Sequence, residues 1–166
     1  MKSRGFPPIA DRAARVLILG SLPGVESLRR REYYAQPRNA FWAIMGELAG
    51  AGPALGYAAR GRRLRAHGIA LWDVCAAARR PGSLDAAIVS ASVVVNDFAD
   101  FYAAHPRIER ICFNGAAAAA LYSRQVLPQL TAALRELPSV VLPSTSPAHA
   151  ALSPARKLRR WAQALR

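Results

Sequence analysis

Four short apolar runs, separated by segments of helical character, constrain the fold of this chain most strongly. They occupy residues 15–20 (RVLILG), 69–74 (IALWDV), 110–114 (RICFN) and 140–143 (VVLP). Runs this short and this continuously apolar are typical of strands buried on both faces of a sheet. Helices between successive strands favour parallel pairing, because a parallel connection needs a crossover. We therefore expect an α/β fold of three layers, α/β/α, with a central four-stranded parallel sheet between helices.

The segments between and after those runs carry apolar residues at helical spacing and are bounded by helix-breaking or capping residues. The predicted helices span residues 39–50, 53–66, 96–105, 116–124, 129–137 and 153–165. Residues 21–36 are polar and are predicted to form a loop with one helical turn. The last helix is the best defined, because Ser153 suits its N-cap and Pro154 its first turn.

A single domain is expected over residues 1–166, because this length suits one hydrophobic core and no repeat or linker divides the chain. Lys and Arg number 23 against 10 Asp and Glu, which gives a formal net charge of +13. A surplus of that size favours a polyanionic partner, nucleic acid first and an anionic membrane surface second. The alternative is compositional: the basic residues are nearly all Arg in an Ala-rich chain, which a GC-rich genome also produces.

Cys75 and Cys112 are too few for a disulfide framework, an iron–sulfur cluster or a structural zinc site. The three histidines have no carboxylate cluster near them in the sequence, so neither a metal ion nor another cofactor is expected. The first residues lack the apolar core of a secretory signal, and no apolar run is long enough to cross a bilayer. We expect a cytoplasmic, nucleoid-associated monomer that makes no membrane contact.

Ligand sites in parallel α/β sheets lie at the carboxyl ends of the strands. That rule selects the loops at residues 20–24, 73–80, 114–115 and 144–149. In the first of them, Gly20 and Gly24 let the backbone approach a ligand closely, although such segments are as often simple turns. The spacing matches neither a Walker A loop nor a dinucleotide-binding GxGxxG.

Residues 33–42 (YYAQPRNAFW) interleave aromatic, basic and amide side chains. Aromatic rings offer faces for base stacking, Arg38 can meet a phosphate, and Asn39 offers both a donor and an acceptor. The alternative is structural: Phe41 and Trp42 would be core residues, and Asn39 the N-cap of the following helix.

Polar residues end the other strands. Asp73 would either accept hydrogen bonds from loop amides or contact a ligand. Asn114 stands before a glycine without an evident packing reason, so a site role and a structural hydrogen bond are equally open. After the last strand, residues 143–149 (PSTSPAH) offer hydroxyls and amides suited to a phosphodiester. The proline-stiffened tip at residues 147–151 is the candidate for a wedge that enters a duplex.

These segments together resemble the hypoxanthine-DNA glycosylases, the deoxyinosine-removing branch of the uracil-DNA glycosylase superfamily. The resemblance is carried by GFPPI at 5–9, LGSLPG at 19–24, SL at 27–28, YY at 33–34, PRNAFW at 37–42, LWDV at 71–74, FNG at 113–115 and STSPAH at 144–149. The segments occur in order over nearly the whole chain, and the YY…NxFW string is specific. The resemblance implies a four-stranded parallel sheet between helices, a flipped-out base and hydrolysis of its N-glycosidic bond.

The resemblance also implies roles for particular residues. Mismatch-specific relatives carry an Asn before the Pro of the first motif, where this chain has Leu22. In the hypoxanthine branch the water-positioning role belongs to the Asn of the NxFW string, which is Asn39 here. Asn114 is a second candidate for base contact. The superfamily's His-Pro-Ser can be aligned with residues 142–144 or further along, which leaves the role of His149 open.

The implied site has three parts. The catalytic candidates are Asn39 and His149. The base-binding candidates are Gly20, Ser21, Leu22, Phe41, Asp73 and Asn114. The DNA-binding candidates are Pro23, Gly24, Arg38, Ser144, Thr145, Ser146, Pro147 and Ala148.

The expected function is that of a monofunctional DNA glycosylase in base excision repair. Its partner would be double-stranded DNA with a deaminated base, hypoxanthine first and uracil or xanthine otherwise. The strand would stay uncut, because the only lysines, Lys2 and Lys157, lie outside the motif loops. Two alternatives are a non-catalytic DNA-binding protein of the same fold, suggested by Leu22, and an α/β hydrolase of nucleotides or esters, for which a GxSxG elbow is lacking.

Overall fold

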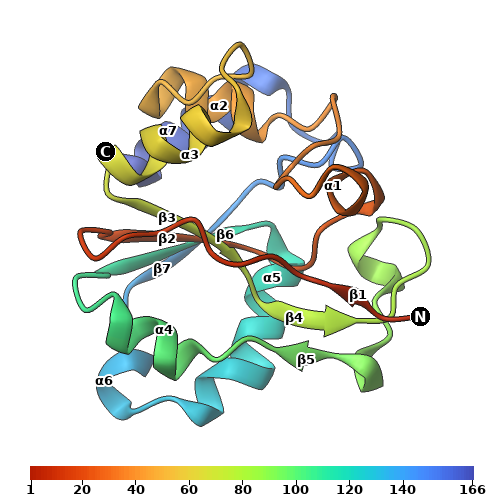
Figure 1. Cartoon of the computed structure of the whole chain (residues 1–166), viewed down its shortest axis with the longest axis vertical. Coiled ribbons are helices and arrows are strands. Elements are labelled where there is room, and N and C mark those ends of the chain that lie inside the picture. Colours follow the sequence, from red (N-terminus) through yellow and green to blue (C-terminus); the bar gives the residue numbers. More distant parts are fainter.

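A four-stranded parallel sheet lies at the centre of the computed structural model, which describes all residues from Met1 to Arg166 (Figure 1). Its strands are β2 (Val16–Gly20), β3 (Ile69–Asp73), β6 (Arg110–Asn114) and β7 (Ser139–Leu142). They run in the order β3-β2-β6-β7, and every adjacent pair is parallel. The strand positions predicted from the four apolar runs are confirmed, with ends that differ by a residue or so.

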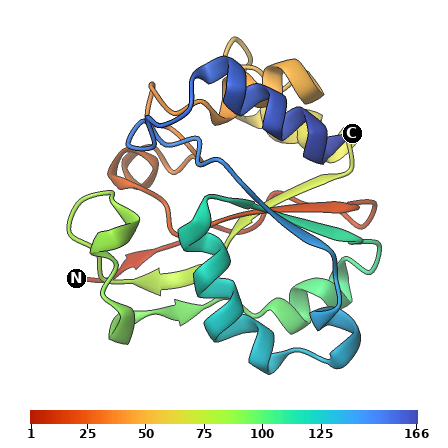
Figure 2. The ribbon, with the colours of Figure 1, turned by 180° about the vertical axis from the view of Figure 1, so that it is seen from behind.

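Helices cover both faces of this sheet, as two opposite views show (Figures 1 and 2). One face carries α2 (Phe41–Ala49), α3 (Tyr57–Ala66) and α7 (Pro154–Leu165). The other face carries α4 (Phe98–Ala104), α5 (Ala116–Leu121) and α6 (Ala132–Arg135). A further helix, α1 (Val25–Arg30), follows the carboxyl end of β2. The predicted three-layer α/β/α architecture is confirmed.

The covering helices explain why β2 and β3 are buried along their whole length. On one face, Trp161 of α7 is fully buried and meets the ring of Phe41 edge-on, with ring centroids 6.1 Å apart. On the other face, Trp72 of β3 packs against Phe98 of α4 at 5.0 Å. Large aromatic side chains therefore join α7 to α2 on one face of the sheet and α4 to β3 on the other.

A second, smaller sheet was not predicted. It is antiparallel, in the order β1-β4-β5, and consists of β1 (Ser3–Arg4), β4 (Cys75–Ala78) and β5 (Val94–Val95). The prediction of a loop over residues 73–80 is therefore wrong, since Asp73 ends β3 and half of the segment is β4. Strands of two to four residues, one of them nearly all alanine, lack the apolar run or the alternation that marks a strand.

The segment after α5 also differs from the prediction. It continues through a π-helical turn (Tyr122–Val126) and a 3₁₀ turn (Leu127–Gln129), and the predicted helix over residues 129–137 shrinks to α6. Pro128 lacks a backbone N–H and Leu130 is extended, so no helix continues across them. The helix predicted over residues 53–66 begins only at Tyr57. Two further 3₁₀ turns follow β4, at Asp85–Ala87 and Ser90–Ser92.

Candidate active site

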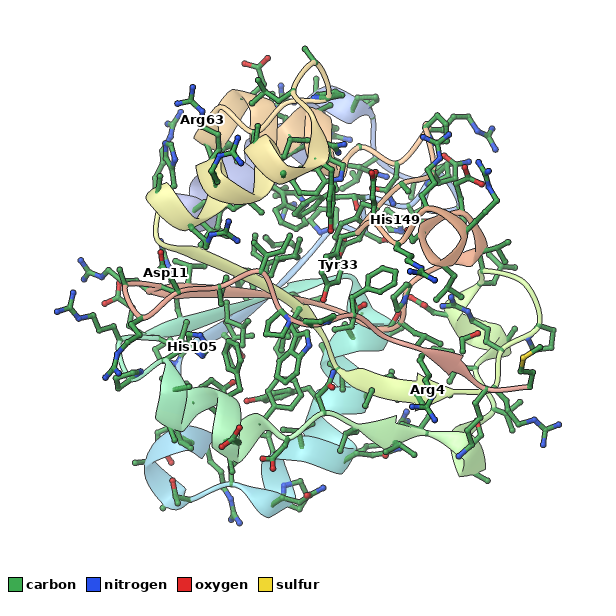
Figure 3. The ribbon with its side chains drawn as sticks, in the orientation of Figure 1. Arg4, Asp11, Tyr33, Arg63, His105 and His149 are labelled. Carbon is green, nitrogen blue, oxygen red and sulfur yellow. The ribbon has the colours of Figure 1, made fainter.

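A cleft of about 720 Å³ opens at the carboxyl ends of the parallel strands. Its walls are the loop from β2 into α1, residues 33–39 before α2, residues 83–85, and residues 144–149 after β7. Figure 3 shows His149 beside α1 and Tyr33 nearer the sheet at this end of the molecule. A cleft of this size suits a small organic group such as a nucleoside.

Gly20 makes the floor of the cleft possible. A Cβ atom at this position would stand 2.5 Å from Oδ1 of Asp73 and 2.7 Å from the hydroxyl oxygen of Tyr34. Both distances are well below van der Waals contact, so a side chain here would displace the carboxyl and the phenol. The glycine at the end of β2 therefore brings two polar groups from separate segments to one point.

The Asp73 carboxyl is buried at the end of β3, with 4% of the residue exposed, and its Oδ2 has no hydrogen-bond partner. Burial raises the pKa of this carboxyl to about 7; the charge of Asp85 adds to the rise, and the Arg80 guanidinium opposes it. Near neutral pH the carboxyl therefore keeps its proton for much of the time. A protonated carboxyl can donate a hydrogen bond to a ligand, whereas a carboxylate only accepts.

The Tyr34 hydroxyl is a second buried polar group without a hydrogen-bond partner. Burial, with the nearby charge of Asp73, raises its pKa far above the ordinary tyrosine value, and the Asn114 amide opposes the rise. The residue has a left-handed backbone (φ 53°), which is uncommon outside glycine, and its ring stacks on Phe41 at 4.2 Å. Tyr34 is thus a second protonated donor on the cleft floor.

Asn39 bonds to the first turn of α2 and also lines the cleft. Its Oδ1 accepts a hydrogen bond from the backbone N–H of Phe41 at 2.9 Å, in the first turn of α2. The N-cap of α2 is Ala40, so the prediction that Asn39 is the cap is wrong by one residue; Asn39 still bonds to the first turn, and this bond does not displace its functional role. An amide oxygen has a second lone pair and the amide nitrogen two N–H groups, so the Asn39 side chain can still hold a water molecule in a fixed orientation.

Thr145 connects three segments of the site. Its hydroxyl oxygen accepts a hydrogen bond from Nδ2 of Asn114 (2.9 Å), and its N–H donates to Oδ1 of the same side chain (2.9 Å). Its carbonyl accepts from the N–H of Ala40 (3.0 Å), next to Asn39. Thr145 and Asn114 therefore hold the end of β6, the loop after β7 and the start of α2 in one arrangement.

Helix α7 supports the loop after β7 from behind. Nζ of Lys157 donates to the carbonyls of His149 (2.6 Å) and Ser146 (3.4 Å), and Nε1 of Trp161 donates to the carbonyl of Pro143 (3.0 Å). Lys157 is buried, and burial lowers its pKa. Its ammonium group is thus committed to backbone carbonyls, which fixes the loop that carries His149.

Arg80 supports the β2–α1 loop, on the opposite side of the cleft, in the same way. Its guanidinium, 1% exposed, donates to the carbonyls of Leu22 (3.2 Å) and Pro23 and lies 3.4 Å from the carboxylate of Asp85. Asp85 in turn accepts a hydrogen bond from the Ser21 hydroxyl at 2.5 Å. This network fixes the loop after β2, whose carbonyls would otherwise be buried without partners.

The structure brings together nearly all the residues that the sequence selected. The predicted site residues that line the cleft are Gly20, Ser21, Leu22, Pro23, Gly24, Arg38, Asn39, Asp73, Asn114, Ser144, Thr145, Ser146, Pro147, Ala148 and His149. The assignment of Phe41 as a base-binding residue is corrected, because its ring is fully buried and lies beneath Tyr34. The assignment of Thr145 to DNA is also corrected, because it is 1% exposed and its polar atoms are engaged within the chain.

The site also contains residues that the sequence analysis did not select: Tyr34, Arg80, Asp85 and Lys157. Tyr34 lay within the aromatic segment, so its chemistry was visible but its position was not. Lys157 carried a signal, as the one lysine in a final helix whose other basic residues are arginines. Nothing in the sequence distinguishes the buried Arg80 from the exposed Arg79 beside it.

Two other features of the structure bear on the range of functions. No three His, Cys, Asp or Glu side chains come together in a group that could hold a metal ion. None of the helices has the length and apolar character that a bilayer crossing requires.

Comparison with known proteins identifies the family. A family model described as the uracil DNA glycosylase superfamily matches residues 7–166. A protein from Methanosarcina acetivorans named hypoxanthine DNA glycosylase is 37% identical over 144 residues, which cover 81% of this chain and 90% of the relative. A protein of the same name from Methanosarcina barkeri is 38% identical over 116 residues, 69% of this chain and 72% of the relative.

The fold is likewise shared with a solved structure. The solution NMR structure of a Methanosarcina acetivorans protein, described provisionally as a uracil DNA glycosylase, superposes with a TM-score of 0.81 at 35% identity. The superposition covers 100% of this chain and 98% of that one. With a matching fold, a cleft at the expected strand ends and a family match over nearly the whole length, this chain belongs to the uracil DNA glycosylase superfamily and is a DNA glycosylase.

Proposed function

We propose that this protein is a monofunctional DNA glycosylase that flips a deaminated base out of double-stranded DNA and hydrolyses its N-glycosidic bond, with hypoxanthine as its preferred base. The observation that carries the proposal is the cleft floor, where Asp73 and Tyr34 present two buried donors without partners inside the protein. The names of the two Methanosarcina relatives support the choice of base. A non-catalytic DNA-binding protein is not favoured, because binding DNA does not require two buried hydrogen-bond donors at the bottom of a cleft.

The reaction needs a water molecule near the anomeric carbon of the flipped nucleotide. As the glycosidic bond breaks, its electron pair goes to the base and the sugar becomes cation-like. Asn39, at the cleft wall, holds the water that attacks this carbon, and the proton that the water loses passes to solvent. A neutral amide suffices for this role, because the water attacks a cation that is already nearly formed.

Asp73 and Tyr34 act on the departing base. Negative charge grows on the base during bond cleavage, and fixed donors in a water-poor site stabilise it strongly. Hypoxanthine has a carbonyl where adenine has an amino group, so a donor facing that position favours hypoxanthine. If adenine left such a buried donor unpaired, the penalty would be about 1–3 kcal/mol. The imidazole of His149, on the opposite wall, is the second candidate for a donor to the base or sugar.

The charge of the chain supplies affinity for DNA. The formal net charge of +13 favours the phosphate backbone without selecting a sequence. Arg38 and Ala148 are exposed at the cleft rim, where a strand would pass. Flipping a base costs a few kcal/mol and costs least for a mispaired base, such as hypoxanthine opposite thymine. Selectivity for damage therefore begins before the base enters the cleft.

We further propose that residues 1–166 work as one domain and as a monomer, in base excision repair at the nucleoid. One cluster of 35 buried apolar residues joins both helical layers to the parallel sheet, which supports the single-domain prediction. Asn39, Asp73 and Asn114 line one cleft within a single chain, so no second copy is needed to bring these three side chains together.

A base-release assay tests the proposal. Duplexes that contain inosine, uracil or xanthine are incubated with excess protein, and abasic sites are detected by strand cleavage on heating with alkali. The wild-type protein should release hypoxanthine fastest and leave the strand uncut before alkali. Release of none of the three bases would overturn the proposal.

Two variants separate the roles of Asn39. Asn39→Ala removes both the amide and the oxygen that accepts from the N–H of Phe41, whereas Asn39→Ser keeps an oxygen that can accept this bond but has no amide. If the amide positions water, both variants should lose about 10²–10³-fold in single-turnover rate. Only Asn39→Ala should also lose helix stability. Near wild-type activity of Asn39→Ser would remove the amide from the mechanism.

A further inference from the structure

The two edges of the parallel sheet differ in how they are covered. At the β3 edge, the N-terminal segment pairs with the strand: the N–H of Ile9 donates to the carbonyl of Leu71 (2.9 Å), and the N–H of Leu71 donates to the carbonyl of Ile9 (2.8 Å). At the other edge, β7 has β6 as its only partner strand. An uncovered edge is a place where another chain can add a strand, and proteins usually protect it.

The backbone of β7 has free hydrogen-bonding groups along this edge. The carbonyls of Pro138 and Leu142 accept backbone hydrogen bonds (2.9 and 3.0 Å) from β6 and the residue that follows it. Because the groups of a strand alternate in direction, the N–H and C=O of Ser139 and Val141 point away from β6. No loop of the chain bonds to them. These groups are therefore free to pair with a partner.

A groove of about 380 Å³ runs along β7 and the second half of α7. Its apolar lining includes Val140 and Val141, which are 40% and 52% exposed. In Figure 2 the blue segment that contains β7 crosses in front of the rest of the sheet, below α7. The groove thus combines a free strand edge with exposed β-branched side chains, which suit the apolar side chains of an added strand.

The charge around the groove selects the kind of partner. Arg110 and Arg160 line the groove, and neither forms a salt bridge within the chain. The Nε of Arg110 is buried without a hydrogen-bond partner. No Asp or Glu occurs after Glu136, so no acidic residue of β7, the following loop or α7 balances these charges. A carboxylate is the complementary group, because its two oxygens accept from a guanidinium.

Two other occupants fit this groove less well. A second copy of the chain, paired through β7, would bring the same arginines together, and the formal net charge of +13 opposes self-association. A DNA backbone would satisfy the arginines, but it has no N–H to pair with the outward carbonyls and would cover the valines with charged phosphates.

We propose that this groove binds an extended, acidic segment of another protein, which adds to β7 as a further strand. The backbone of the segment pairs with Ser139 and Val141, and its apolar side chains pack on the valines. Its carboxylates bind Arg110 and Arg160. The groove and the catalytic cleft share no lining residue, so a partner bound here leaves the cleft free for DNA.

Fluorescence anisotropy tests this proposal with a labelled peptide of about six residues, the length of an ordinary strand, in which Asp and Val alternate. The whole protein is titrated into the peptide at low salt. Arg160→Glu should weaken binding about tenfold, because it reverses a charge that faces the peptide. Arg62→Glu is the matched control, since Arg62 is exposed on α3 and does not line the groove. It should weaken binding less than about twofold.

Methylated peptides test the backbone pairing. In an added strand, one alternate set of N–H groups faces β7 and the other faces solvent. N-methylation of the first set should therefore weaken binding about tenfold, and N-methylation of the second should weaken it less than about twofold. Val141→Pro makes the same test from the protein side, because it removes an outward N–H and spares the bonds to β6. Chemical denaturation checks that this variant folds; if it unfolds, the peptides and Arg160→Glu decide.

The remaining outcomes would overturn the proposal. Equal binding of both methylated peptides would exclude strand addition, and equal losses in Arg160→Glu and Arg62→Glu would reduce the interaction to general charge. No peptide binding, together with loss of DNA binding in Arg160→Glu, would assign the groove to DNA. A dimer in sedimentation that Val141→Pro abolishes would assign it to a second copy of the chain. None of these measurements depends on base release, so they leave the glycosylase proposal untouched.

Discussion

The two walls of the cleft are built differently. On the wall formed by the β2–α1 loop and residues 80–85, the buried guanidinium of Arg80 lies 3.4 Å from the half-exposed carboxylate of Asp85. The charges of both side chains act on Asp73, whose pKa is raised to about 7. On the wall formed by residues 143–149, the connections are the Thr145–Asn114 pair and carbonyl contacts from Trp161 and Lys157. The first wall therefore both holds the β2–α1 loop in place and influences Asp73, which titrates near neutral pH. The second wall mainly fixes the position of the loop after β7.

This difference predicts that the first wall is the more costly one to disturb. Arg80→Met should remove the partners of two buried carbonyls and lower the free energy of unfolding by about 3 kcal/mol. It should also weaken activity, because the loop that carries Gly20 depends on the guanidinium. Chemical denaturation of the variant measures the loss.

Arg79→Met is the control for this comparison, because Arg79 is the exposed neighbour of Arg80 and its side chain forms no hydrogen bond or salt bridge. Its stability should stay within about 0.5 kcal/mol of wild type. An equal loss in both variants would mean that charge alone, and not the buried contacts, stabilises this wall.

A smaller effect is expected on the second wall. Thr145→Val keeps the shape of the side chain and the backbone bonds but leaves Nδ2 of Asn114 without its acceptor. The free energy of unfolding should fall by about 1–2 kcal/mol. Duplex activity should fall with it, since the start of α2 and therefore Asn39 depend on the same residue.

Thr145→Ser restores the hydroxyl and serves as the matched control. It should recover most of the activity, although the lost methyl group costs some packing in a fully buried position. If Thr145→Val matched wild type in both stability and rate, the second wall would owe its position to α7 alone.

The sequence predicted the parallel sheet because its strands are buried on both faces, and burial on both faces leaves a continuous apolar run such as LILG in β2. It did not predict β4, because four residues with the sequence CAAA suit a strand, a helix or a loop equally. The chain order of the motifs, together with the rule on strand ends, located most of the cleft.

The remaining features depend on contacts between distant segments. Asp73 and Tyr34 meet only because β2 and β3 pair in a register that sets Gly20 opposite Asp73. The sequence suggests Phe41 as a base-binding ring, because it does not show that Tyr34 adopts a left-handed backbone and covers this ring. Burial of Arg80 has no sequence signal at all, since its partners are backbone carbonyls that every residue possesses.

The raised pKa of Asp73 also predicts how stability depends on pH. The unfolded chain releases this proton near pH 4, while the folded chain keeps it until about pH 7. The contribution of Asp73 to folding is therefore most favourable below pH 4, declines as the pH rises to 7 and is fully lost above it. Asp73→Asn removes this dependence and should be the more stable protein at pH 8.

The same titration gives the most direct test of the catalytic account, in which protonated Asp73 donates to the departing base. Single-turnover release of hypoxanthine is measured between pH 5.5 and 9 for wild type and Asp73→Asn. The wild-type rate should fall as the pH rises through about 7, and the rate of Asp73→Asn, whose amide donates at every pH, should change little over that range. A wild-type rate that rises through pH 7, or an unchanged pH profile in Asp73→Asn, would contradict the account.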